Sequence, residues 1–231
     1  MSYPFFYEQF DRIEFIHLSE ASIHHVVHVL RMKKGEQFWL TNGKGIKCRT
    51  LLTDVSKRAC AIEILETIVE EKPSHHFHLA ISFTKNPSRI EWLLEKTTEI
   101  GVAHITPLIT KRSEKIFFKK ERFEKILVSA MLQSQQTFLP ILNEPIYFEE
   151  ILKSTEPIKL IAHCLENEKK IMRDELKENL STIILIGPEG DFTPEEINAA
   201  MQNNFIPVSL GNKRLRTETA GLYACVVFNS L

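Results

Sequence analysis

Short apolar runs separated by glycine turns mark the first part of the chain. Strands are expected at 37–41, 46–52 and 59–69, and the turn Asn42-Gly43-Lys44-Gly45 lies between the first two. Asn-Gly favours a hairpin because the central positions of a tight turn need positive φ. One short helix is expected at 21–32, from the helical spacing of Ile23, Val26, Val27 and Leu30. This part of the chain therefore predicts a small β-barrel or sandwich.

The pattern changes at the charged stretch 69–74, which predicts a boundary between domains of residues 1–72 and 73–231. Beyond it, apolar strands alternate with amphipathic segments of helical length, the rhythm of an α/β domain with a largely parallel sheet. We expect strands at 77–83, 105–109, 159–164, 182–186 and 206–210. We expect helices at 88–100, 118–135, 166–180, 194–203 and 218–230.

Four helix ends are marked by capping residues. Asn86 precedes a first-turn proline, and Thr193 has Glu196 three positions later. Gly101 is suited to end the helix at 88–100 in the left-handed conformation. Thr217 is expected to cap the last helix.

Composition narrows the class of protein. A chain of 231 residues can bury one large core or two modest ones without a disulfide or a metal. The four cysteines form no Cys-x-x-Cys pair, and the histidines at 24, 28, 75, 76 and 78 lack a His-Glu-x-x-His pattern, so no metal site is expected. No leader and no apolar run of roughly 20 residues is present. We expect a cytoplasmic protein without a membrane segment.

The net charge limits how this protein could bind nucleic acid. With 29 basic and 30 acidic residues, its net charge of −1 provides no global positive field. Any RNA contact must come from local patches. The basic stretch at 111–125 is one candidate, although a solvated helix face is the favoured interpretation.

The strand at 182–186 leads into the loop Gly187-Pro188-Glu189-Gly190-Asp191-Phe192 and then directly into a capped helix. Ligands bind outside the carboxyl ends of strands in open α/β sheets, and glycines let a ligand approach the backbone. A phosphate-binding loop is disfavoured, because no Gly-Lys-Ser/Thr or Gly-x-Gly-x-x-Gly is present. The carboxylates of Glu189 and Asp191 would also repel phosphate.

A second strand, at 206–210, leads into Gly211-Asn212-Lys213-Arg214-Leu215-Arg216 and the last helix. For either loop alone, an ordinary connection stays open as an alternative. In that case Thr217 and Glu218 only start the helix, and the basic residues are solvated.

Together, the two loops resemble the RsmE family of ribosomal RNA uridine-N3 methyltransferases, within the SPOUT superfamily of knotted methyltransferases. The family pattern Gly-Pro-Glu-Gly-Gly-Phe followed by Leu-Gly-x-x-x-Leu-Arg-x-Glu-Thr-Ala is similar to residues 187–192 and 210–220. The likeness extends to the His-x-x-x-Val-Leu-Arg helix at 25–31, the hairpin at 43–45 and the α/β unit at 90–107. The sequence departs from the family pattern in two places. Asp191 replaces the second glycine of Gly-Pro-Glu-Gly-Gly-Phe. In an element that the family has as Glu-Gln-Ser-x-Arg, Leu132 replaces the glutamate and Gln136 replaces the arginine.

The resemblance implies a C-terminal SPOUT α/β domain with a trefoil knot, a rare topology, and a smaller N-terminal PUA-like β-barrel that presents RNA. It implies S-adenosylmethionine as cofactor, held largely by backbone groups. The cofactor-binding residues would be Ile186, Gly187, Gly190, Leu210, Gly211, Leu215 and Ala220.

The implied reaction methylates uridine N3 of 16S rRNA in the small ribosomal subunit. The enzyme must align N3 with the methyl carbon at roughly 3–3.5 Å and remove the N3 proton or favour the anion. Arg216 is expected to stabilise the anion, since a guanidinium stays charged and donates two hydrogen bonds. Glu189 or Glu218 is expected to take the proton.

The resemblance also leads us to expect residues that contact RNA and a second copy of the chain. The RNA-binding residues would be Arg12, Arg31, Lys33, Lys85 and Arg89, with ordinary surface charge as the alternative for each. The resemblance also implies a homodimer. Two other functions stay open, a 2′-O-ribose RNA methyltransferase of the same superfamily and a non-catalytic RNA-binding ribosome-assembly protein.

Overall fold

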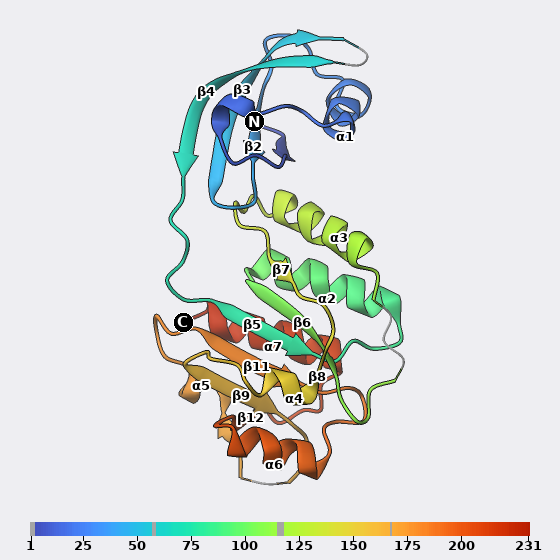
Figure 1. Cartoon of the computed structure of the whole chain (residues 1–231), viewed down its shortest axis with the longest axis vertical. Coiled ribbons are helices and arrows are strands. Elements are labelled where there is room, and N and C mark those ends of the chain that lie inside the picture. The colour runs from blue at the N-terminus through green and yellow to red at the C-terminus, as the bar shows by residue number, and fades with distance from the viewer. Residues whose placement is uncertain (1–2, 57–58, 115–117, 167) are drawn as a thin grey trace. The chain divides into compact units, whose positions relative to one another are not determined.

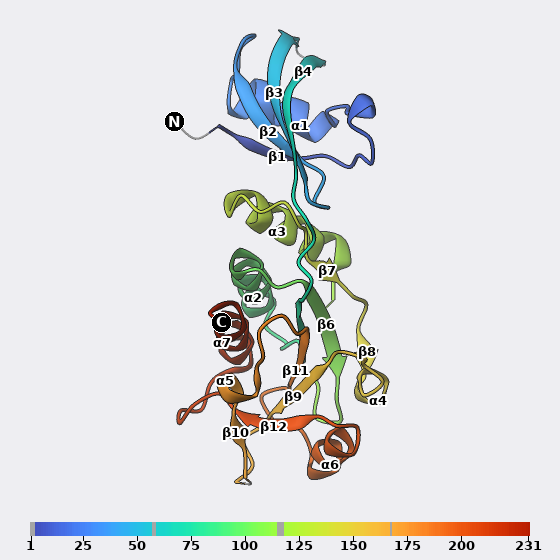
Figure 2. The same ribbon diagram turned by 90° about the vertical axis from the view of Figure 1, so that its left-hand side faces the viewer.

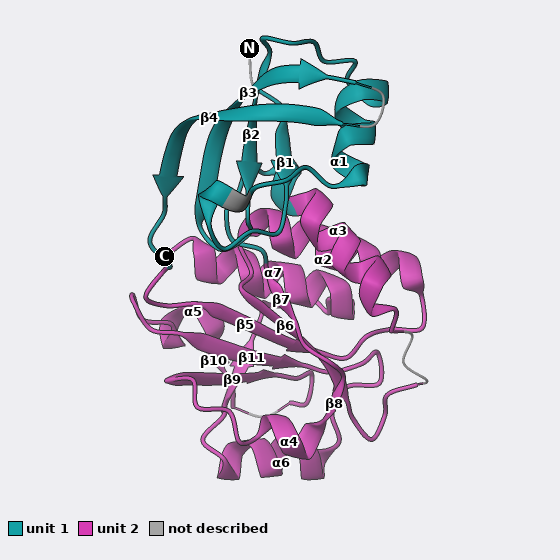
Figure 3. Ribbon diagram, turned by 45° about the horizontal axis from the view of Figure 1, so that its top comes forward, with its two compact units in different colours: residues 1–72, 131–139 teal, residues 73–130, 140–231 magenta. Residues whose placement is uncertain are grey.

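The computed structural model describes residues 3–56, 59–114, 118–166 and 168–231, which fold into two compact units (Figure 3). Unit 1 comprises residues 1–72 and 131–139, and unit 2 comprises residues 73–130 and 140–231. The sequence-based division assigned 131–139 to the second domain. These residues pack with unit 1, where Gly45 N donates to Thr137 O (3.0 Å) and Leu139 N donates to Gly43 O (2.8 Å).

Unit 1 contains one four-stranded sheet. Its strands are β1 (Phe5–Tyr7), β2 (Gln37–Thr41), β3 (Ile46–Val55) and β4 (Cys60–Val69), in the order β1-β2-β3-β4. β1 runs parallel to β2, and the other pairs are antiparallel. The expected hairpin joins β2 to β3, with Gly43 at φ 68° and Gly45 at φ 93°. The sheet buries Phe38, Leu40, Cys48 and Leu52 in the core of the unit.

The helix expected at 21–32 is shorter and irregular. After a 3-10 turn η1 (Ile13–Phe15), Ser19 Oγ accepts from Ser22 N and caps α1 (Glu20–His24). The chain then continues as the π-helical turn η2 (His25–Val29) and reaches Arg31 at φ 53°. The expected C-terminal end was therefore wrong, because the widened turn ends the helix before Arg31.

Unit 2 is built on an eight-stranded sheet in which every pair is parallel, as the sequence predicted. The path runs β10-β12-β9-β11-β5-β6-β7, and β8 also pairs with β6 (Figure 1). The strands are β5 (Phe77–Ile81), β6 (His104–Ile109), β7 (Ile141–Leu142), β8 (Ile146–Tyr147), β9 (Ile158–Ala162), β10 (Lys170–Ile171), β11 (Thr182–Ile186) and β12 (Ile206–Ser209).

Helices cover both faces of this sheet. They are α2 (Pro87–Ile100), α3 (Lys120–Gln133), α4 (Phe148–Ile151), α5 (Met172–Glu175), α6 (Pro194–Gln202) and α7 (Thr217–Asn229). Figure 2 shows α2 and α7 on one face and α4 and α6 on the other. The caps expected at Asn86, Thr193 and Gly101 are confirmed, with Gly101 at φ 102°.

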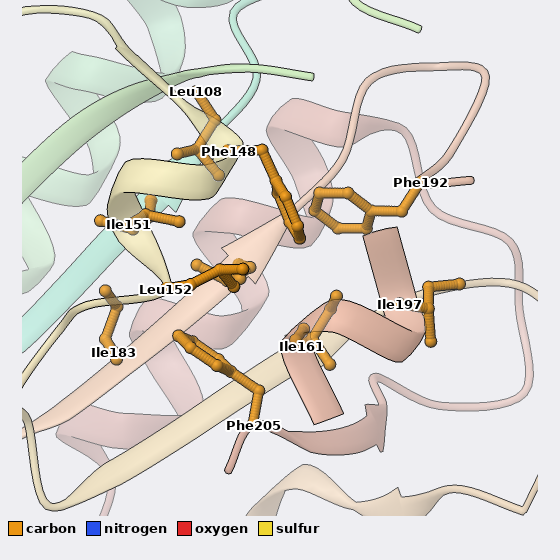
Figure 4. Close-up of a cluster of buried hydrophobic side chains, with 12 residues drawn as sticks. Leu108, Phe148, Ile151, Leu152, Ile161, Ile183, Phe192, Ile197 and Phe205 are labelled. Carbon is orange, nitrogen blue, oxygen red and sulfur yellow. The ribbon is translucent and has the colours of Figure 1, made fainter. Parts of the chain in front are cut away.

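The apolar cluster under α4 and α6 anchors one of the glycine loops (Figure 4). Phe192, the last residue of the 187–192 loop, is fully buried there, and its ring centroid lies 5.5 Å from that of Phe148. On the opposite face, a Cβ added to Gly221 would lie 2.8 Å from Ile81 Cδ1 and 3.0 Å from Leu93 Cδ1. Glycine therefore permits α7 to approach β5 and α2 closely.

Two local expectations were wrong. The helix at 166–180 is replaced by β10 and the single turn α5, because Lys170 and Ile171 pair with β12 and Met172 is buried. Tertiary contacts here override a helix-favouring composition. At the last helix, Arg216 occupies the N-cap position, and the Thr217 hydroxyl instead donates to Gly187 O (3.2 Å).

Candidate active site

Three neighbouring strands of unit 2 end at one pocket. β12, β9 and β11 are adjacent and parallel, so the loops that follow them leave the same edge of the sheet. These loops enclose a cavity of about 640 Å³. Its lining comes from Ala162, His163, Cys164 and Lys169 after β9, from Ile186, Gly187, Pro188, Glu189 and Asp191 after β11, and from Val208 to Thr217 and Ala220 after β12.

The loop after β11 is a tight turn that is held from several sides. Asp191 N donates to Pro188 O (2.9 Å) and closes the turn. A Cβ on Gly187 would lie 3.1 Å from Phe192 N, so the glycine allows the turn to close this tightly. Arg112 Nη1 donates to Gly190 O (2.7 Å), and Thr217 holds Gly187 O. The pocket wall is therefore built before any ligand arrives.

In the loop after β12, Gly211 has a φ of 114°, a conformation that favours glycine. Ser209 Oγ accepts from Gly211 N (3.2 Å) and supports this bend. The loop then carries the exposed side chains of Lys213, Arg214 and Arg216 along the pocket to the start of α7. Cations thus line the mouth of the cavity.

The loop after β9 is the part of the site that the sequence analysis missed. It carries no glycine and matches no motif, so its only signal was the position of a predicted strand. The strand order places it between the two recognised loops. Its Cys164 backbone N donates to Asp191 Oδ2 (2.7 Å).

His163 is the most unusual group in the pocket wall. Its side chain is buried, and neither ring nitrogen has a hydrogen-bond partner among the described residues. Burial and the nearby charge of Lys169 lower the pKa of His163, against the opposing charge of Asp191. This shift favours the neutral ring, which presents one donor and one acceptor.

Most of the residues expected to bind the cofactor meet at this cavity. Gly190 is the exception, since it packs against Arg112 behind the pocket, and the six that line it are Ile186, Gly187, Leu210, Gly211, Leu215 and Ala220. Of the expected catalytic residues, Arg216 and Glu189 line the pocket and are exposed. Glu218 does not line it.

Glu218 lies buried at the start of α7. Its Oε1 is 3.6 Å from Arg89 Nε, and its Oε2 has no hydrogen-bond partner among the described residues. The arrangement ties the first turn of α7 to the first turn of α2. It favours a role in positioning over direct contact with a ligand.

The expected RNA-binding residues divide between the units. Arg12, Arg31 and Lys33 are exposed on unit 1, and Arg12 borders a hollow there that also includes Asn42 and Lys44. Lys85 and Arg89 belong to unit 2. Lys85 Nζ lies 3.2 Å from a carboxylate oxygen of Glu114.

In the part of the chain that the structure describes, no three histidine, cysteine, aspartate or glutamate side chains gather as a metal site. No helix of that part is long and apolar enough to cross a membrane.

A parallel α/β domain with a pocket at the ends of adjacent strands is a common arrangement for binding a small molecule. Family models give it a more specific identity. A model described as an RNA methyltransferase domain matches residues 70–229, and one described as an RNA methyltransferase PUA domain matches residues 18–65. The chain belongs to the RNA methyltransferase family and is an RNA methyltransferase with the PUA-like and SPOUT architecture.

Individual proteins are similar to this chain over nearly its full length. The ribosomal RNA small subunit methyltransferase E of Synechocystis sp. is 31% identical, with 93% of this chain and 72% of that protein covered. The structure of a probable rRNA-methyltransferase from Porphyromonas gingivalis gives a TM-score of 0.90 at 36% identity, covering 96% of this chain and 95% of that one. The ribosomal RNA small subunit methyltransferase E of Neisseria gonorrhoeae, bound to S-adenosyl methionine, gives 0.87 at 28% identity, covering 99% and 97%.

Proposed function

We propose that this enzyme transfers a methyl group from S-adenosylmethionine to N3 of a uridine in 16S rRNA. The observation that carries the proposal is the cavity formed by the three loops after β9, β11 and β12. Two of the similar proteins, those of Synechocystis sp. and Neisseria gonorrhoeae, are ribosomal RNA small subunit methyltransferases, and the second holds the proposed cofactor.

The pocket residues fit an adenosyl cofactor. A cavity of about 640 Å³ is within the range of small-molecule sites. Ile186, Leu210 and Leu215 offer apolar contacts, and the close-packed turn at Gly187 brings backbone groups to the cavity. The ring of His163, which has no hydrogen-bond partner among the described residues, offers a donor and an acceptor for a polar ligand. When bound, the cofactor supplies an electrophilic methyl group.

The protein's own residues must then prepare the uridine. Neutral N3 carries a proton and is a poor nucleophile, so its removal has to accompany methyl transfer. Arg216, exposed at the pocket mouth, is assigned to stabilise negative charge on the base, because its guanidinium remains charged and can donate two hydrogen bonds. Glu189, also exposed in the pocket, is assigned to accept the proton.

Glu218 is assigned a supporting role through Arg89. Their ion pair joins the starts of α7 and α2, and α7 begins directly after Arg216. Loss of this pair would shift the backbone that carries Arg216. Glu218→Gln is therefore expected to lower turnover less than Arg216→Ala, whereas Glu189→Gln should raise the pH at which turnover reaches its maximum.

Unit 1 is proposed to hold the RNA, through Arg12, Arg31 and Lys33, with Lys85 and Arg89 contributing from unit 2. Phosphate contacts by lysine and arginine make affinity depend on salt. Neutralising Arg31, Lys85 and Arg89 together should weaken RNA binding and reduce the slope of log affinity against log salt. An unchanged slope would remove these residues from the interface.

We also propose that the enzyme works in the cytoplasm as a homodimer. Trp92 and Ile100 on α2 and Tyr223 and Val226 on α7 are large apolar side chains that stay exposed, between 39% and 44%. α2 and α7 pack together on the same face of the sheet, so these exposed side chains lie on two neighbouring helices. A second copy would cover the outer surface of this helix pair. Light scattering on Tyr223→Glu and Trp92→Glu variants should report monomers if this face is the interface.

The reaction is tested by methyl transfer from labelled S-adenosylmethionine into small ribosomal subunits of cells that lack this gene, followed by nucleoside analysis. The proposal predicts 3-methyluridine. A 2′-O-methylated nucleoside would assign the protein to the ribose methyltransferases. Cofactor binding without transfer to any RNA, or no binding at all, would favour the non-catalytic RNA-binding function.

A further inference from the structure

Asp191 joins two of the three loops that form the pocket, at a position where the family pattern quoted above has glycine. Its Oδ2 accepts from Cys164 N at 2.7 Å, and its Oδ1 accepts from Phe192 N at 2.8 Å. Hydrogen bonds from backbone amides to a carboxylate are among the stronger ones in proteins. We propose that Asp191 is a positioning residue that fixes the loop after β9 as a wall of the cofactor pocket, an inference that rests on the proposed cofactor.

The backbone at this position would suit glycine. Asp191 has φ 63°, in the left-handed region that glycine enters freely and that aspartate tolerates at a cost. Its amide closes the turn onto Pro188 O, so the conformation is part of the loop. Glycine would keep the turn and lose the carboxylate. What Asp191 adds here is therefore its two side-chain hydrogen bonds.

The loop that carries Asp191 is a firm support. Arg112 Nη1 donates to the carbonyl oxygens of Gly190 (2.7 Å) and Phe192 (3.3 Å), on both sides of Asp191. The Phe192 side chain is fully buried in the apolar cluster under α4 and α6. Asp191 thus projects from a backbone that is held on each side.

The loop after β9 has few hydrogen bonds to its surroundings, although Leu165 packs against the apolar cluster under α4 and α6. Lys169 Nζ donates to His163 O (3.1 Å) and Leu165 O (2.8 Å), and both acceptors belong to the same loop. Among the described residues from Cys164 to Lys169, the hydrogen bond from Cys164 N to Asp191 is the one that reaches another loop. Removing it would leave this wall, including His163, with the packing of Leu165 but without its hydrogen bond to the loop after β11.

A wall that is ordered before binding saves the ligand the entropic cost of ordering it. The inference is tested by calorimetric titration of S-adenosylhomocysteine into wild type, Asp191→Gly and Asp191→Asn. Asp191→Gly should weaken binding on the order of tenfold, the effect of losing one well-placed hydrogen bond. Asp191→Asn should weaken binding less than Asp191→Gly, because its amide oxygen can still accept from Cys164 N while its NH2 group faces Phe192 N.

Hydrogen exchange supplies a readout that does not use the cofactor. The Cys164 amide should be protected in ligand-free wild type, and exchange across 162–166 should accelerate in Asp191→Gly while β12 stays unchanged. Equal affinity of Asp191→Gly and wild type, or equal damage by Asp191→Asn and Asp191→Gly, would overturn the inference.

An unprotected Cys164 amide in ligand-free wild type would also overturn it, whether or not Asp191→Gly folds. A protected amide in a wild-type protein that fails to bind S-adenosylhomocysteine would instead count against the proposed cofactor.

Discussion

Replacing Thr217 with valine tests how the two glycine loops are held together. The Thr217 hydroxyl, on a buried side chain, donates to the buried carbonyl of Gly187 at 3.2 Å, and thus links the start of α7 to the loop after β11. Valine keeps the shape of threonine and removes the donor. The carbonyl then stays buried without that donor.

The expected loss follows from the geometry. Leaving a buried acceptor unpaired costs about 1–3 kcal/mol, and a bond at the long end of the usual range belongs in the lower part, about 1–2 kcal/mol. For a protein of this size that is a fall in melting temperature of roughly 2–8 °C. If instead the loss falls on the cofactor-bound state and spares the free protein, affinity drops roughly fivefold to thirtyfold.

Thermal unfolding and titration with S-adenosylhomocysteine measure both effects. Thr217→Ser is the matched control, because it keeps the hydroxyl, and it should retain most of the stability and affinity. The reasoning would be refuted if Thr217→Val matched wild type in both measurements. It would equally be refuted if Thr217→Ser were as damaging as Thr217→Val.

Three further predictions concern other parts of unit 2. Burial raises the pKa of Glu156, but hydrogen bonds from His78 and Ser154 and the charge of His78 outweigh it and lower the pKa to about 2. The folded pKa lies below the unfolded one, so this stabilisation is present above about pH 4.5 and is lost as pH falls toward 2. Urea unfolding of Glu156→Gln should lose that part of the acid dependence, and an unchanged profile would contradict it. Arg216→Lys should lower turnover at least tenfold with little change in cofactor affinity, since lysine lacks the paired donors, and full turnover would remove the case for the guanidinium. Thr193→Ala should destabilise α6 by about 1 kcal/mol through loss of its capping box, measured by urea unfolding with Thr193→Ser as control.

The parts of the site that the sequence predicted are those with a local signal. Gly187 directly follows the buried strand β11, Gly211 lies two positions after the end of β12, and the caps at Asn86 and Thr193 depend on residues within one helical turn. Because these features depend only on residues close together in the sequence, they can be predicted without knowing the fold.

The parts that the sequence missed depend on contacts between distant segments. The loop after β9 enters the pocket because β9 lies between β12 and β11, an order that no local pattern encodes. The segment 170–175 has a helix-favouring composition, yet pairing with β12 fixes Lys170 and Ile171 as a strand. Residues 131–139 join unit 1 through bonds to Gly43 and Gly45, about ninety positions earlier.

The central claim is that all three loops form one cofactor site. Hydrogen exchange with and without S-adenosylhomocysteine tests it most directly, using the full chain. The account predicts that the ligand slows exchange in three separate segments, 162–164, 186–191 and 208–217, and leaves the β3–β4 hairpin of unit 1 unchanged. Protection confined to one of these segments, or located elsewhere in the chain, would contradict it.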